Sequence, residues 1–219
     1  MPFRPAPLLN GVIRRRRMGT RINVLVDHDL TDTRNRGSVM ARLATALPAA
    51  LAVRDYWRLA DPRSQRDDLE VWRADPVSPR EPCLHCYTGP GSLFLSVTAQ
   101  AACIHTGGRW RGFLSIEPLR RVHLAAFRQI AGSLGSRCLV FYADSCEVDD
   151  LFWGGRSQWE CIELMERMWG PPQRSVEEIS PRVAAAAEHT VPMVWFLDSG
   201  QISAEQVATA HGGRDPGSS

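Results

Sequence analysis

The stretch "INVLVDHDLTDT", residues 22–33, decides the fold class, because an apolar run there gives way to a cluster of polar turn formers. Its aliphatic and β-branched residues 22–26 predict a buried β-strand. The polar part places Asp27 and Asp29 two residues apart, with Thr31 two residues further on. This part either connects a strand to a helix or forms a catalytic loop, and the two interpretations lead to different functions.

Strand-like and helix-like segments alternate along the rest of the chain. Val39, Leu43 and Leu47 recur at helical spacing, and Pro48 interrupts that helix. Further elements are predicted from apolar runs and caps: strands within 93–110, 138–142 and 193–197, and helices that start at Ser115, at the Ser157/Glu160 capping box and at Ser180. We therefore expect an α/β fold, with α+β possible, in which a mixed sheet of about five to six strands packs with about four to five helices.

The chain is expected to form one globular domain, because 44% of its residues are hydrophobic and no internal repeat is present. The domain should span residues 21–200, with a proline-rich excursion at about residues 60–90. Residues 1–20 are interpreted as a disordered basic leader and residues 201–219 as a flexible tail.

Charge and composition exclude several functions. All 26 basic residues are arginines, so chemistry that needs a lysine amine is excluded. The net charge is +2, but the first 21 residues hold six arginines and no acid, so the remainder is mildly acidic and nucleic acid is an unlikely partner. No apolar run approaches the roughly 18 residues of a membrane span. Six scattered cysteines and no export signal predict a cytoplasmic protein with reduced thiols.

The DxDxT pattern of Asp27, Asp29 and Thr31 resembles the first motif of the haloacid dehalogenase-like phosphohydrolases. The resemblance implies that Asp27 is a nucleophile, that Asp29 is an acid or base, and that Mg²⁺ is the cofactor. A later acidic motif of that family would correspond to Asp144 with Asp149 or Asp150. The other interpretation is that the first group consists of turn and cap residues between a strand and a helix.

A second alternative is a zinc site. Cys83 and Cys86 form a CxxC pair, and Cys103 with His105 forms a second pair of soft ligands. Four such ligands can close a tetrahedral zinc site, although CxH is not a standard zinc-knuckle spacing. Packing of Cys103 in a strand is the competing interpretation.

The segment of residues 144–169 suggests protein binding. It holds seven acids and two arginines, a net charge of −5, together with one phenylalanine and three tryptophans. Aromatic anchors beside carboxylates suit a surface that docks a basic protein. The other interpretation is a solvated helix face with its aromatic residues in the core. The residues expected to contact the partner are Asp144, Glu147, Asp149, Asp150, Trp153 and Trp159.

The leading hypothesis is therefore a non-enzymatic, cytoplasmic bacterial protein that binds another protein, without a metal or other cofactor. Its specific form is a toxin-neutralising, immunity-type protein that covers a basic enzyme. A Mg²⁺-dependent phosphohydrolase is the main alternative, and it requires Asp27, Asp29 and one of the later aspartates to reach a single cation.

Overall fold

The computed structural model describes residues 21–33, 35–60, 69–76, 85–173, 175–176 and 194–198. The leader of residues 1–20, the tail of residues 201–219 and the helix expected at Ser180 lie outside the described residues, as does most of the proline-rich excursion. Strands and helices alternate in the described part, which confirms the expected α/β class. The strands are β1 (Arg21–Val26), β2 (Arg73–Asp75), β3 (His85–Gly89), β4 (Leu93–Val97), β5 (Ala102–Arg109), β6 (Leu139–Ala143) and β7 (Trp195–Asp198).

These seven described strands form one sheet in the order β2-β3-β4-β5-β1-β6-β7. Every neighbouring pair is antiparallel, so the expected mixed sheet is an antiparallel one. An isolated parallel bridge joins Gln173 to Phe196 in β7. The first strand in the described sequence, β1, lies between β5 and β6 in the middle of the sheet.

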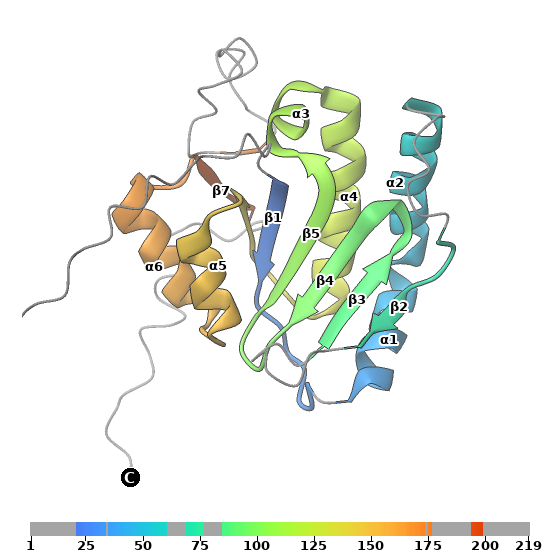
Figure 1. Ribbon diagram of the computed structural model, residues 1–219, viewed down its shortest axis with the longest axis horizontal. Helices are drawn as coiled ribbons and strands as arrows, with labels where there is room; N and C mark the ends of the chain where they lie inside the picture. Colours follow the sequence, from blue (N-terminus) through green and yellow to red (C-terminus); the bar gives the residue numbers. More distant parts are fainter. Residues whose placement is uncertain are drawn as a thin grey trace, which may run out of the picture.

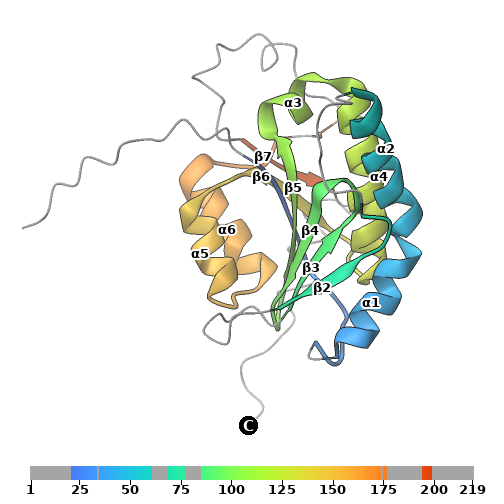
Figure 2. The same ribbon diagram turned by 45° about the vertical axis from the view of Figure 1, so that its right-hand side comes forward.

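Helices cover both faces of this sheet. They are α1 (Arg36–Thr45), α2 (Leu47–Ala60), α3 (Trp110–Ser115), α4 (Glu117–Ser133), α5 (Cys146–Trp153) and α6 (Gln158–Trp169), with a short 3₁₀ turn, η1, at Pro90–Ser92. Figure 2 shows α1, α2 and α4 on one side of the sheet and α5 and α6 on the other. No helix in the described ranges is long and apolar enough to cross a membrane.

The alternation of side chains along β1 explains the two layers. Ile22, Val24 and Val26 are fully buried in the core beneath α1 to α4, whereas Leu25 belongs to the core beneath α5 and α6. Successive strand residues point to opposite faces, so an apolar run with no polar face predicts a strand covered on both sides. All five residues of β6 are buried for the same reason.

Helices α5 and α6 cover only part of their face. Strands β3, β4 and β5 face the viewer in Figure 1, and no described helix lies in front of them. Phe94 in β4 and Thr88 in β3 are correspondingly only half-buried. The α5 and α6 helices thus form a separate layer at one end of the sheet.

Local sequence signals account for most helix boundaries. The break between α1 and α2 falls at Ala46, two residues before Pro48, and the Ser157/Glu160 capping box starts α6 as predicted. The start predicted at Ser115 is wrong. Ser115 ends α3 and its hydroxyl donates to the Arg111 carbonyl, while α4 begins two residues later without a side-chain cap.

Candidate functional site: the α5–α6 layer

Helices α5 and α6, together with the loop that joins them, form the α5–α6 layer, residues 144–169. Gly154 ends α5, and Gly155 turns the chain with a φ of 78°, a backbone conformation that favours glycine. Gln158 then anchors α6 to the sheet, because its Nε2 donates to the carbonyls of Leu25 (3.0 Å) and Cys138 (2.9 Å). The layer is therefore fixed by buried bonds as well as by apolar packing.

The outer side of the layer is acidic. Glu147, Asp150, Glu163 and Glu166 are all exposed. Within the described part of the chain, none of these four forms an ion pair, whereas Arg156 pairs with Glu160 at 3.2 Å. The layer keeps its net charge of −5 largely on the surface.

Hydrogen bonds keep two of the acids ionised. The Ser157 backbone amide donates to Glu160, and this bond lowers the pKa of Glu160. The backbone amide of Glu147 itself, followed by the Ser145 hydroxyl at 2.8 Å, lowers the pKa of Glu147. Hydrogen bonds to a carboxylate favour its charged form, so both residues carry negative charge at neutral pH.

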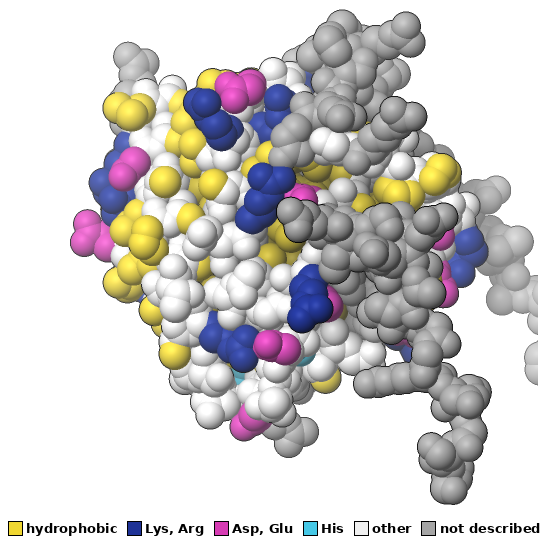
Figure 3. All heavy atoms as spheres, turned by 180° about the vertical axis from the view of Figure 1, so that it is seen from behind, with side chains coloured by type: hydrophobic (Ala, Val, Ile, Leu, Met, Phe, Trp, Pro, Cys, Tyr) yellow, Lys and Arg dark blue, Asp and Glu magenta, His cyan; other side chains and the backbone are white. Residues whose placement is uncertain are grey.

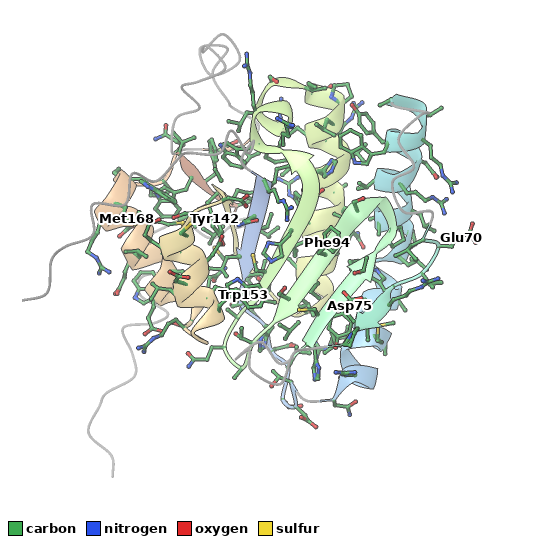
Figure 4. All side chains as sticks on the ribbon, in the orientation of Figure 1. Glu70, Asp75, Phe94, Tyr142, Trp153 and Met168 are labelled. Carbon is green, nitrogen blue, oxygen red and sulfur yellow. The ribbon has the colours of Figure 1, made fainter. Side chains whose placement is uncertain are left out.

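Two tryptophans lie at the margins of the layer, half-buried. Trp153 at the end of α5 stacks on His105 of β5, with ring centroids 6.5 Å apart and an interplanar angle of 5°. Trp159 in α6 donates its indole N–H to Glu163 at 2.9 Å. Figure 4 shows Trp153 and Phe94 on the same side of the sheet. The layer thus combines half-buried tryptophan rings with exposed carboxylates, the combination expected for a protein-docking surface.

Asp149 differs from the other predicted partner-binding acids because its carboxylate points to the sheet. Its Oδ1 accepts bonds from the Asn23 side chain at 3.2 Å and from the Tyr142 hydroxyl at 3.0 Å. Burial raises the pKa of Asp149 to about 6, and the two hydrogen bonds offset only part of that rise. Asp149 is therefore an internal contact between α5 and the sheet. Asp144, for its part, accepts a bond from the Arg21 backbone amide at 3.1 Å.

The same internal cluster includes His105 and Cys103. Asn23 donates to Asp149, so its Oδ1 faces His105 Nδ1 at 3.0 Å, and that ring nitrogen carries the proton. Burial, followed by the positive charge of Arg21, lowers the pKa of His105 to about 4. Burial also raises the pKa of the Cys103 thiol well above its usual value. A neutral thiol and a weakly basic histidine do not form a nucleophile with its general base.

The two halves of the predicted phosphohydrolase site lie at opposite ends of the paired strands β1 and β6. Asp27 and Asp29 follow Val26, which pairs with Leu139 at the start of β6. Asp144 follows the other end of β6, where its amide donates to the Arg21 carbonyl. The antiparallel pairing of β1 and β6 causes this separation, because the carboxyl ends of two antiparallel neighbours lie at opposite ends of the pair. The described structure therefore does not bring together the two halves of the predicted Mg²⁺ site.

The motif residues after β1 have local partners instead. Asp27 accepts a hydrogen bond from the Ser136 hydroxyl, and Asp29 forms an ion pair with Arg42 of α1. Thr31 is exposed in the turn that leads to α1, where Asn35 serves as the N-cap. These contacts agree with the interpretation of the stretch as a connection between a strand and a helix.

The structure does not gather the predicted zinc ligands. Cys83 lies outside the described residues. Cys86 in β3 and Cys103 in β5 are separated by Ser96 of β4, which pairs with both. Among the described residues, no group of three or more histidine, cysteine or acidic side chains is placed to hold a metal ion. His105 instead binds Asn23 and stacks on Trp153.

Sequence reasoning missed Asn23 and Tyr142, which position Asp149. Asn23 gives a signal in retrospect, because it is the one polar residue in the apolar run of β1 and is 1% exposed. A buried amide needs hydrogen-bond partners, so such a residue predicts a buried polar cluster. Tyr142 gives no comparable signal, since a tyrosine in a strand is ordinary.

Comparisons of the chain with protein-family models, with curated proteins and with solved structures found no match.

Proposed function

We propose that the chain is a protein-binding protein whose α5–α6 layer docks a basic protein. The observation that carries the proposal is the exposed acidic side of α5 and α6, whose Asp150 and Glu163 form no ion pair in the described part of the chain, beside the half-buried ring of Trp153. Carboxylates of this kind steer a positively charged partner, and the rings supply contact energy.

The rest of the described surface supports this choice of face. Seen from behind, the other side of the sheet shows both arginines and acidic residues (Figure 3), but helices α1 to α4 together hold eight arginines and only two acidic residues. Arg121 and Glu117, for example, lie one turn apart on α4 at 3.7 Å. The excess of arginine on α1 to α4 repels a positively charged partner, whereas the α5–α6 layer, with a net charge of −5, attracts it.

The specific form of the proposal is a toxin-neutralising protein of the bacterial cytoplasm, whose partner is a basic enzyme such as a nuclease. Neutralisation needs occlusion and no catalytic group, in keeping with a buried, neutral Cys103 and a weakly basic His105. The five described cysteines are free thiols, as expected in a reducing compartment.

The test is co-expression of the full chain with a panel of basic bacterial nuclease toxins, with growth as the first readout. Rescue by the unaltered chain identifies the partner, and its association rate is then measured at low and high salt. The double variant Asp150→Arg/Glu163→Arg should slow association by about tenfold or more, because its two reversals change the charge of the layer from −5 to −1.

Glu70→Arg is the matched control, because Glu70 is an acid with a 79% exposed side chain outside the layer. Equal association rates for the double variant and for Glu70→Arg would contradict the assigned surface. Failure to protect against every toxin in the panel would contradict the toxin-neutralising form.

A further inference from the structure

The contact between Asp149 and the sheet is asymmetric in its hydrogen bonding. Asn23 and Tyr142 both donate to the same oxygen, Oδ1, and in the described part of the chain no residue donates to Oδ2. A carbonyl oxygen can accept two bonds, so a proton on Oδ2 leaves both of them intact. Protonation of Oδ2 therefore costs neither of the hydrogen bonds that hold this carboxyl on the sheet.

The ionised carboxylate fits less well, because its neighbours are acidic or neutral. Asp144 and Asp150 flank it on the helix side and add negative charge. Cys103 and Tyr142 face it from the sheet, and Cys161 faces it from α6. The pKa values of all three are raised, with burial as the main cause, so they are neutral near neutral pH.

Among the described residues, no basic group offsets the negative charge of an ionised Asp149. His105 is neutral above about pH 4, and Arg21 acts on the His105 side of the cluster. In the described residues, Asp149 has no ion pair with an arginine. A half-buried carboxylate without a cation is unfavourable, because the low-dielectric surroundings penalise its charge.

We propose that Asp149 is a proton switch for α5: the helix packs firmly on the sheet when this carboxyl is protonated and detaches more readily when it is ionised. Because α5 also carries Glu147, Asp150 and Trp153, the switch would regulate the proposed docking surface, and this last step rests on the proposed function. The switch itself is a property of the chain alone and is tested without a partner.

The expected pH dependence follows from linkage. The pKa of Asp149 is raised from 3.8 to about 6 in the folded chain, so the packed state of α5 binds more protons than the detached state between these two values. Protection of α5 is therefore greatest at low pH and falls as the pH rises through about 6. If detachment exposes Asp149 to water, the opening equilibrium rises about tenfold between pH 5 and pH 8.

The experiment is hydrogen–deuterium exchange of the α5 backbone amides at pH 5 and pH 8, with rates corrected for intrinsic exchange. The unaltered chain should show about tenfold lower protection of α5 at pH 8 than at pH 5. Asp149→Asn has no titrating carboxyl, and its Oδ1 can still accept both bonds, so its protection should be the same at the two pH values. Glu166→Gln, the matched control on an exposed acid of the layer that is not among the groups acting on Asp149, should behave like the unaltered chain.

A second variant tests the switch without removing the carboxyl. Tyr142→Phe deletes a hydrogen bond that lowers the pKa of Asp149, so the transition should move to a higher pH. Carboxyl NMR of the unaltered chain should show Asp149 titrating near pH 6. A midpoint below about 4.5, or a pH dependence that survives in Asp149→Asn, overturns the switch, and neither result bears on whether the layer binds a basic protein.

Discussion

The carboxylates that follow β1 and the carboxylates of the α5–α6 layer have different surroundings. After β1, Asp27 is bound to Ser136, and Asp29 is paired with Arg42 and packs against Gly135. On the α5–α6 layer, Asp150 and its exposed acidic neighbours form no ion pair in the described ranges. The first group therefore fixes a connection in the fold, whereas the second keeps its charge exposed to solvent.

This difference shows that residue type alone does not assign a function to an aspartate. A DxDxT motif suggests catalysis, yet antiparallel pairing removes the second half of the site from its reach. An acidic helix suggests only solubility, yet exposed acids that form no ion pair within the described ranges are the better candidates for recognition. If the first group stabilises the fold and the second does not, substitutions in the first group lower the free energy of unfolding more than substitutions in the second.

The largest effect is expected for Gly135→Ala, in the group after β1. A Cβ at Gly135 would overlap the Asp29 carboxylate, and the φ of 80° disfavours any side chain. We expect a loss of about 3 kcal/mol in the free energy of unfolding, measured by urea denaturation.

Gly155→Ala is the control for the backbone term, because Gly155 has a φ of 78° and a new Cβ there meets nothing within 4 Å. Its expected loss is about 1 kcal/mol. Equal losses for the two variants would show that Asp29 is not packed against Gly135 as described.

The next effect concerns how the α5–α6 layer is held on the sheet. Gln158→Leu removes both donors to the Leu25 and Cys138 carbonyls, so we expect a loss of about 2 kcal/mol in unfolding free energy. Gln129→Leu on the exposed side of α4 serves as the control and should change stability by under about 0.5 kcal/mol. If Gln158→Leu leaves the free energy of unfolding unchanged, apolar packing alone holds the layer on the sheet.

The smallest effect compares one acid from each group. Asp29→Asn weakens the ion pair with Arg42 and should reduce stability by about 0.5 to 1 kcal/mol, because both side chains are partly exposed. Glu163→Gln should leave thermal unfolding unchanged within about 0.5 kcal/mol, since Glu163 is exposed and has no ion pair in the described chain. A larger loss for Glu163→Gln than for Asp29→Asn would reverse the assignment of the two groups.

Much of the fold is predictable from local signals. The apolar run of β1, the break before Pro48 and the capping box at Ser157 each have a cause within a few residues, and all three are confirmed. Strand β3 is harder, because its sequence HCYTG has little apolar character and falls within the predicted excursion. Its pairing with β4 supplies the stabilisation that its own residues lack.

The candidate site is less predictable, because it depends on strand direction and helix rotation. Asp149 and Asp150 are adjacent in sequence, yet the first contacts Asn23 and the second faces solvent. A rotation of about 100° per residue separates their directions, and only the packing of Val148 and Phe152 fixes that rotation. No sequence motif indicates which of the two aspartates points toward the sheet.

The central place of β1 in the sheet has a consequence for biosynthesis. β1 leaves the ribosome before its two partners, β5 and β6, which lie some 80 to 120 residues later in the chain. A nascent chain that ends before Leu139 therefore carries an apolar strand with one edge unpaired, a template for self-association. We expect β1 to complete its pairing only after Leu139–Ala143 has been synthesised, and chaperones to protect its open edge until then.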